Sequence, residues 1–434
     1  MKILKLALPS IISNLTVPLM GLFDVAIVGH LSSTSYIGAI AIGGMMFSLL
    51  YWGFTFLRMG TGGLTAQAFG RGDRKEIIIQ LYRPVLIAVG ISLLILLLHR
   101  PIEWLILSLI GESGSGLNHW ASVYFRIVVW GAPAVLSLYA FNGWFIGIQR
   151  PKITMYIALF QNILNVIFSL LFVYAFGLQV EGVALGTLLG QWAGVLLAVV
   201  CVAFEGRSPE WSESLSTRSI PTKRDLFNRT ALLEYFHVNK NIFGRTCCLI
   251  AVTVSFTSFG ARQGETLLAV NTLMMQLFTI FSYFMDGFAY AGESLSGAYW
   301  GAGERDKLRQ TVGALFFWGW ILMLLFALLY GVGGIHFLNL LTNQQEILQA
   351  CTPYMGWSAL IPVCGFAAFL WDGIYIGLTQ TKLMFRIMFC AMSLYFLLYF
   401  LLFPYLQNHG LWLAFLSYLS LRGLLQGYYF RKIA

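Results

Sequence analysis

The sequence predicts an all-α integral membrane protein whose twelve transmembrane helices form two pseudo-symmetric six-helix lobes around a central cleft. Of the 434 residues, 58% are hydrophobic and only 10% are charged, whereas a soluble domain typically carries about 25% charged residues. Long apolar runs recur along the whole chain, and its second half repeats landmarks of the first. Charge is therefore too scarce for a surface that faces water on all sides.

Twelve segments are long enough to cross a bilayer, which takes about 20 apolar residues in a helix. In the first half we expect spans at residues 3–31, 36–66, 77–99, 118–147, 152–176 and 181–204. In the second half we expect spans at residues 237–260, 267–298, 310–336, 348–378, 383–404 and 410–430. The predicted domains are an N-lobe (1–204), a polar, Ser-rich cytoplasmic linker (205–236) that we expect to be partly an amphipathic helix, and a C-lobe (237–434).

The basic residues predict the orientation of these spans. Most of the 27 Lys and Arg residues fall in segments on the same side of the membrane as the N-terminus, and only Arg100 and Arg262 fall in segments on the other side. Cytoplasmic loops are enriched in Lys and Arg. We therefore expect both termini in the cytoplasm of a multi-pass protein of a bacterial cytoplasmic membrane.

The two halves share three landmarks in the same order. Gly70–Arg74 (GRGDR) matches Gly301–Arg305 (GAGER), Gly143–Gly147 matches Gly373–Gly377, and Gly182–Leu185 matches Gly410–Leu413. Each half holds an even number of spans, so the two copies are parallel repeats related by an axis along the membrane normal. Two such lobes meeting at a cleft favour a transporter that works by alternating access.

A single acid, Asp24, lies in the first span, and its repeat equivalent is Ser255. A charged side chain at the bilayer centre costs about 2.5–3.5 kcal/mol on insertion scales, so Asp24 should face a cavity or a partner. The hypothesis is a protonatable coupling group, and the alternative is a structural acid tied to Asn or Thr on a neighbouring helix. Pro9 and Pro18 lie in the same span, as hinges or as static kinks.

Three segments give the chain its family resemblance: Ala7–Leu31, Phe56–Asp73 and Met285–Asp306. With them the chain resembles the MATE (multidrug and toxic compound extrusion) transporters, and within these the DinF-like branch. The resemblance covers essentially the whole chain. It implies antiport of drug-like, cationic or amphipathic molecules against protons or sodium.

The resemblance also implies a set of polar neighbours for Asp24. These neighbours match Tyr124, Asn142, Asn165 and Thr187. A second acid that is common in span five is absent here, and Ser169 occupies its place. Hard cations prefer several charged oxygens, so this departure argues against sodium in the N-lobe and favours the proton as coupling ion.

Four further charged residues within the predicted spans are candidate functional residues. Asp372 is the repeat mate of Asn142, and it could serve either ion binding, as in some branches of the family, or polar packing. Asp286 and Glu293 are seven residues apart, hence near one face of their helix. Arg58 could pair with them, because intramembrane charges usually pair. Such a pair would be a gate or a fixed structural ion pair.

Several other function classes are disfavoured. The basic residues form short clusters between spans, which fits membrane topology better than nucleic-acid binding, and no phosphate-binding loop for ATP is present. The six histidines fall near span ends, and no catalytic set or metal-ligand spacing is evident, so we expect neither an enzyme nor a bound cofactor. A flippase for lipid-linked precursors would need a cationic cavity, and a passive channel would not need two lobes. The expected partners are small drug-like molecules and the bilayer, and we expect a monomer.

Overall fold

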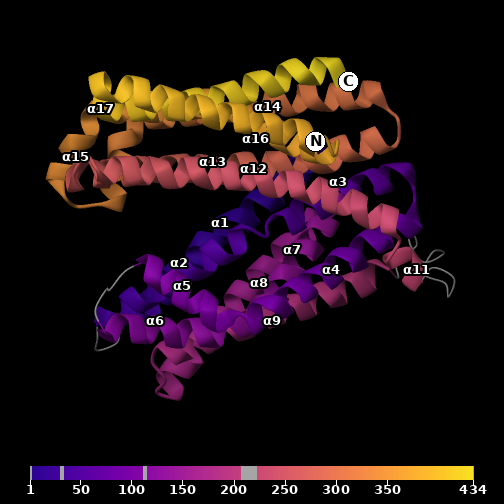
Figure 1. Ribbon diagram of the computed structural model, residues 1–434, viewed down its shortest axis with the longest axis horizontal. Helices are drawn as coiled ribbons and strands as arrows, with labels where there is room; N and C mark the ends of the chain where they lie inside the picture. Colours follow the sequence, from indigo (N-terminus) through magenta and orange to yellow (C-terminus); the bar gives the residue numbers. More distant parts are fainter. Residues whose placement is uncertain (1, 30–33, 111–114, 207–221, 434) are drawn as a thin grey trace. The chain divides into compact units, whose positions relative to one another are not determined.

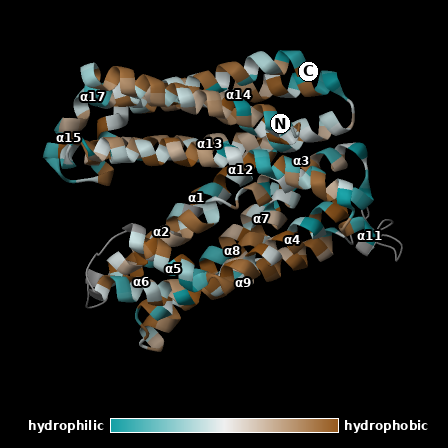
Figure 2. Cartoon of the chain, viewed as in Figure 1, coloured by the Kyte–Doolittle hydropathy of each residue, from teal (hydrophilic) through white to brown (hydrophobic). Residues whose placement is uncertain are grey.

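The computed structural model describes residues 2–29, 34–110, 115–206 and 222–433, and these residues form helices without a strand (Figure 1). Apolar residues run along the helices of the whole chain (Figure 2). A bilayer offers no water to backbone N–H and C=O groups, and a helix satisfies them within its own segment. The all-helical fold class is therefore confirmed.

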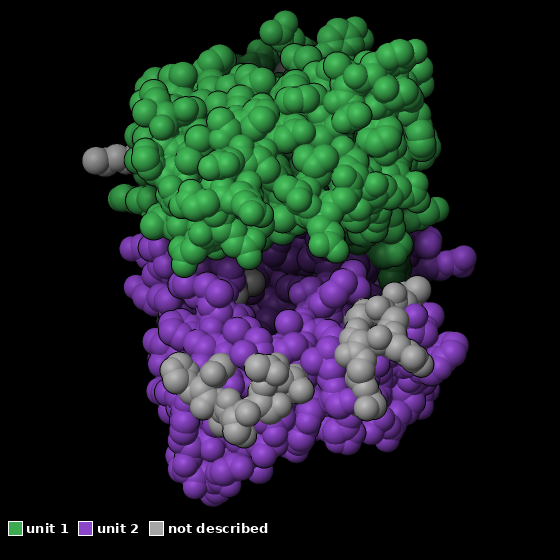
Figure 3. Space-filling view, turned by 90° about the vertical axis from the view of Figure 1, so that its left-hand side faces the viewer, with its two compact units in different colours: residues 1–11, 236–434 green, residues 12–235 purple. Residues whose placement is uncertain are grey.

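The chain divides into two compact units, which Figure 3 colours separately. Unit 1 comprises residues 1–11 and 236–434, and unit 2 comprises residues 12–235. Two helices contribute to both units: α1 (Lys2–Gly29) divides after Ile11, and α12 (Arg229–Ala261) divides after Tyr235.

The remaining helices belong to one unit each. Those of unit 2 are α2 (Thr34–Trp52), α3 (Phe56–Arg71), α4 (Arg74–Leu97), α5 (His99–Ile110), α6 (Ser115–Val128), α7 (Ala132–Gly147), α8 (Pro151–Leu170), α9 (Val180–Glu205) and the short α11 (Lys223–Leu226). Those of unit 1 are α13 (Glu265–Gly301), α14 (Arg305–Leu341), α15 (Gln345–Cys351), α16 (Met355–Gly377) and α17 (Thr381–Ile433).

Ten helices in the described ranges are long and apolar enough to cross a membrane, or eleven if the bent pair α2–α3 forms one more span. That pair bends by 41° and covers the second predicted span. The 53 residues of α17 cover the last two predicted spans, and the non-helical Gln407 (φ 47°, ψ −122°) separates them. A straight helix of that length would be about 80 Å long, more than twice a hydrocarbon core of about 30 Å. The count of twelve stays a prediction.

The internal repeat is visible in the backbone of both units. After α3, Gly72 adopts a left-handed conformation (φ 69°) and Asp73 N donates to Ala68 O over 3.0 Å. After α13, Gly303 does the same (φ 77°), and Glu304 N donates to Tyr299 O over 2.9 Å. These are Schellman-type helix ends, so the first pair of repeat landmarks has one shared backbone geometry.

A second pair of landmarks shares its helix packing. A Cβ on Gly143 of α7 would overlap the carbonyl oxygen of Arg58 on α3, and a Cβ on Gly373 of α16 would overlap that of Ala289 on α13. Small residues allow helix backbones to approach closely in membranes. The α3–α7 crossing of unit 2 and the α13–α16 crossing of unit 1 therefore need glycine at equivalent positions.

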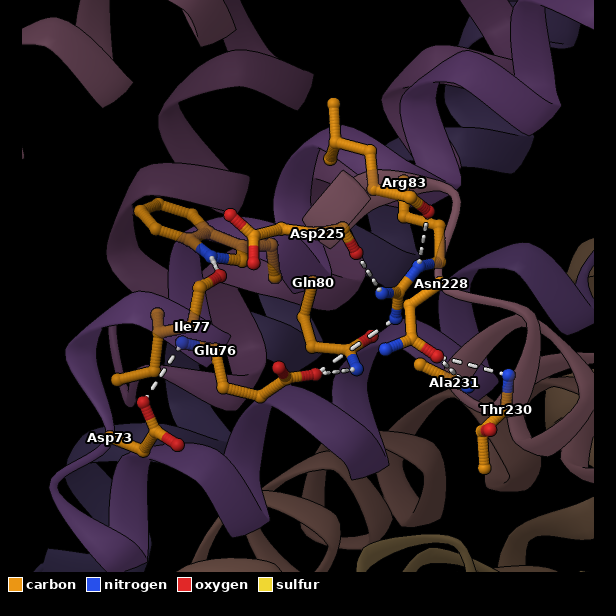
Figure 4. Close-up of polar contacts among 11 residues, drawn as sticks. Asp73, Glu76, Ile77, Gln80, Arg83, Asp225, Asn228, Thr230 and Ala231 are labelled. Atoms are coloured by element: carbon orange, nitrogen blue, oxygen red, sulfur yellow. Dashed lines mark hydrogen bonds and ion pairs between the residues drawn. The ribbon is translucent and has the colours of Figure 1, made fainter. Parts of the chain in front are cut away.

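The second half of the predicted linker is attached to unit 2, while residues 207–221 lie outside the described part. Arg83 of α4 donates from Nε to Leu226 O over 3.2 Å and from Nη2 to Asp225 O over 3.1 Å (Figure 4). Lys75 Nζ lies 2.7 Å from Asp225 Oδ1. The Lys75 ammonium, together with hydrogen bonds from Thr222, lowers the pKa of Asp225 to about 2. We call this segment, residues 222–228, the linker clasp.

The clasp leads directly into α12. Asn228 Oδ1 accepts hydrogen bonds from the backbone N–H groups of Thr230 and Ala231, at 3.0 and 3.4 Å. Asn is a favoured helix N-cap because its side chain satisfies the free N–H groups of the first turn. This helix consequently starts at Arg229, eight residues before the span predicted at 237.

Candidate functional site

Unit 2 contains a cavity of about 520 Å³. Four of the residues predicted for the site line it, namely Asp24, Tyr124, Asn142 and Thr187. They come from α1, α6, α7 and α9, so helices far apart in sequence converge on one space. Asn165 and Ser169 of α8 do not line the cavity; each side chain is fully buried behind it.

Asp24 occupies the buried side of this cavity. Its side chain is 3% exposed, and its Oδ1 atom accepts no hydrogen bond from the described residues. Asn165 and Thr187 flank the carboxyl group. Asn165 Nδ2 donates to Thr187 Oγ1 over 2.9 Å, whereas Asn165 Oδ1 has no donor in the described part of the chain. Asp24 and Asn165 thus each have a side-chain oxygen without a hydrogen-bond donor in the described part of the chain.

Close packing of α8 on α9 places Asn165 beside Thr187. The α9 residues Gly186 and Gly190 face the α8 residues Ser169 and Asn165. A Cβ on Gly190 would lie 3.1 Å from the Asn165 Cβ, and one on Gly186 would overlap the Ser169 Oγ. Because these residues recur every four positions, each set lies along one helix face. The glycine stripe of α9 therefore brings the polar face of α8 to the site.

Sequence reasoning missed several cavity residues. Aromatic side chains form part of the lining, and amides form another part: Phe47, Tyr51, Trp52, Tyr139, Gln161, Asn162 and Gln191. Of the amides, Gln161 gave a signal, since it precedes the predicted residues Asn165 and Ser169 at four-residue spacing on α8. The aromatic residues gave none, because an apolar helix does not reveal which face meets a cavity.

Pro9 and Pro18 both lie inside the continuous helix α1. Pro9 belongs to the part of α1 in unit 1, and Pro18 to the part in unit 2. Within unit 1 the first part is fixed on α13, because a Cβ on Gly287 would overlap the Ile11 side chain. Bending at either proline stays a prediction.

Asp372 lies in unit 1, in a buried ionic cluster on three helices. Its Oδ2 atom pairs with Arg245 of α12 and with Arg422 of α17, the latter at 2.6 Å. Its Oδ1 atom accepts a hydrogen bond from Gln426 Nε2 over 3.0 Å. Sequence reasoning left ion binding and polar packing open for this acid, and neither arginine was recognised as its partner.

The remaining charged candidates lie on two helices. Asp286 and Glu293 are both on α13, where Asp286 is half-buried and Glu293 is fully buried. Arg58 is half-buried on α3 of unit 2. Their pairing stays a prediction.

A multi-pass helical fold with a largely apolar cavity inside one lobe, lined by aromatic rings, amides and one carboxyl group, is typical of membrane transporters for small molecules. Comparison with known proteins agrees. The chain belongs to the MatE family, whose model matches residues 9–171 and 242–401. Its members are transporters and not enzymes.

Two curated relatives and one solved structure show the extent of the similarity. The chain is 36% identical to DNA damage-inducible protein F of Escherichia coli (strain K12), over 96% of this chain and 89% of the relative. It is 21% identical to the multidrug export protein MepA of Staphylococcus aureus (strain MSSA476), over 80% of this chain and 74% of MepA. A crystal structure of MATE in the bent conformation superposes with a TM-score of 0.88 at 17% identity, over 99% of this chain and 94% of that one.

Proposed function

We propose that this multi-pass transporter is a proton-coupled multidrug antiporter of a bacterial cytoplasmic membrane, with both termini in the cytoplasm. It exports cationic or amphipathic drug-like compounds by alternating access, and protonation of Asp24 drives the cycle. The supporting observation is the position of Asp24: a buried carboxyl at a cavity wall, with an oxygen that lacks a hydrogen-bond donor.

The two protonation states of Asp24 differ in what they require. When protonated, the carboxyl group is uncharged and can donate a hydrogen bond, and the polar side chains of Asn165 and Thr187 flank it. When ionised, the carboxylate needs a countercharge, because a buried charge without partners is strongly disfavoured. A cationic cargo in the cavity supplies that charge. Proton and cargo therefore compete for one group, which is the simplest form of antiport.

The cavity fits such a cargo. Its volume of about 520 Å³ lies within the range of about 300–1,000 Å³ that is usual for small-molecule sites. Tyr51, Trp52 and Tyr124 line it, and aromatic faces attract organic cations. The name of MepA, a multidrug export protein, supports the same cargo class.

The free energy released by one proton moving inward per cycle is enough for export. Moving one charge inward across 100 mV releases about 2.3 kcal/mol, and one pH unit adds about 1.36 kcal/mol. Together they sustain a gradient of roughly 500-fold for an uncharged cargo. For a monovalent cation the outward charge cancels the electrical part, and one pH unit sustains about tenfold.

Two alternatives have less support. Sodium coupling would favour more than one carboxylate, and Asp24 is the one acid among the described residues that line the cavity. A flippase for phosphorylated lipid precursors would need basic residues there, and the described lining contains neither Lys nor Arg.

The test is transport of a fluorescent organic cation in proteoliposomes under an imposed proton or sodium gradient. We expect proton-driven transport in the wild type and its loss in Asp24→Asn. The matched control is Asp306→Asn, which makes the same change at an exposed acid at the start of α14 and should transport normally. Wild-type transport by Asp24→Asn would refute the role of Asp24, and a sodium-driven wild type would refute proton coupling.

A further inference from the structure

Unit 1 carries a buried ionic cluster whose charges do not balance. Two guanidinium groups, of Arg245 and Arg422, meet the single carboxylate of Asp372. All three side chains are at most 8% exposed. Asp372 is the one acid within ion-pair distance of either arginine in the described part of the chain.

Each oxygen of the carboxylate has a fixed donor. Arg245 and Arg422 donate to Oδ2, and Gln426 donates to Oδ1. Arginine does not lose its proton in proteins, so both donors persist in every protonation state of the transporter. A proton or metal ion that approached Asp372 would have to displace a permanent positive charge and enter a site with net positive charge.

The part of unit 1 that is equivalent to the Asp24 site, around Ser255, lacks the polar neighbours that Asp24 has in unit 2. By the repeat, the positions of Asn165, Ser169 and Thr187 correspond to Tyr395, Tyr399 and Phe415. In unit 1 these positions hold packed rings: Tyr399 stacks on Phe259 with centroids 3.8 Å apart, and Phe415 lies 5.2 Å from Phe256. Rings thus occupy the places where unit 2 has the polar side chains of its site.

We propose that Arg245 and Arg422 are specificity-determining residues that hold Asp372 permanently ionised, so that Asp372 exchanges neither the coupling proton nor another cation. Ion coupling is thereby confined to Asp24 in unit 2. This inference rests on the proposed proton coupling and adds to it that Asp24, and not Asp372, takes part.

The first experiment labels the wild-type protein in vesicles with dicyclohexylcarbodiimide, which reacts with protonated carboxyl groups. We expect Asp24 to be modified, more so at lower pH, and Asp372 to stay unmodified over the same range, as read by peptide mass spectrometry. The double variant Arg245→Met/Arg422→Met should become labelled at Asp372, because a buried carboxyl without countercharge is favoured in its protonated form. Labelling of Asp372 in the wild type, or none in the folded double variant, would overturn the proposal.

The second experiment removes the whole cluster in Arg245→Met/Asp372→Asn/Arg422→Met. Replacing all members of a buried ion cluster by groups of similar volume is often tolerated, so we expect proton-driven transport within about twofold of the wild type. Loss of coupling in this variant, if it is folded, would contradict the inference while leaving the role of Asp24 intact. Normal coupling in Asp24→Asn would instead refute the proposed function itself. If the triple variant does not fold, the labelling of the wild type decides.

Discussion

Asn165 donates a hydrogen bond to Thr187 over 2.9 Å, and this bond joins α8 to α9 beside the Asp24 carboxyl. The bond uses one of the two hydrogens on Asn165 Nδ2, and Asn165 Oδ1 has no donor in the described part of the chain. The bond therefore holds the Asn165 amide beside the carboxyl group of Asp24.

The first prediction concerns Thr187→Val, which keeps the side-chain shape and removes the acceptor of this bond. We expect the free energy of unfolding to fall by about 1–3 kcal/mol, because the Asn165 amide is then a buried donor without a partner. Because Asn165 is no longer held beside Asp24, pH-driven transport should fall by about tenfold or more. Thermal unfolding in detergent and dye transport in proteoliposomes measure the two effects. Thr187→Ser retains the hydroxyl and should stay near the wild type; equal losses in both variants would contradict the role of the bond.

The second prediction concerns the glycine stripe of α9. Gly190→Leu should destabilise the protein by about 1–3 kcal/mol through overpacking, because a Cβ there already lies 3.0 Å from Gln161 O. The control is Gly90→Leu on α4, where a Cβ would have no neighbour within 4 Å. Detergent-solubilised variants can be compared by thermal unfolding. Equal stability of the two variants would show that the stability of the protein does not depend on the close approach of α8 and α9.

The third prediction separates the two basic residues that hold the linker clasp. Arg83 is 3% exposed and makes two bonds to backbone carbonyls, whereas Lys75 is 58% exposed. For Arg83→Met we expect the local opening free energy of amides 222–228 to fall by about 1.5–3 kcal/mol. For Lys75→Met the change should stay below about 1 kcal/mol. Hydrogen exchange measured by mass spectrometry gives both values, and the reverse order would refute this account of the clasp.

The fourth prediction is the acid sensitivity of the clasp. The pKa of Asp225 falls from its ordinary 3.8 to about 2 in the folded protein. A carboxyl group whose pKa is lowered by folding stabilises the folded form at any pH above its ordinary pKa of 3.8. This stabilisation is lost as the pH falls towards 2. Pepsin, which is active in acid, should therefore cleave within 222–228 faster at pH 2 than at pH 4, beyond its own activity change. Asp225→Asn should abolish this extra acceleration, and an unchanged acceleration in that variant would assign it to another group.

Sequence reasoning reached the elements whose signals are local. The fold class and the chain breaks at Gly72 and Gly303 follow from apolar run lengths and repeated short motifs, whereas the family follows from a resemblance over three segments. Asp24 was identifiable because a single acid in an apolar helix is conspicuous, and in the structure it lies at a cavity.

The features that sequence reasoning missed depend on side chains from distant segments. Nothing in the spacing of Arg245, Asp372 and Arg422 indicates that they meet, because the three residues lie on three helices. The aromatic wall of the cavity was hidden for a related reason. Phe47 and Tyr51 resemble any apolar residues of α2 until α6 and α9 define which face is inside. Asn228, a typical helix N-cap, indicates the early start of α12. The start was missed because the predicted spans were delimited by hydropathy, which excludes a polar first turn.

The division of α1 after Ile11 affects how movements of this transporter can be observed. The first eleven residues belong to the same compact unit as the C-terminal helix α17. Fluorophores or spin labels attached to the two chain ends would therefore both report on unit 1, and their separation would stay constant while a substrate crosses. An informative probe pair needs one member between residues 12 and 235.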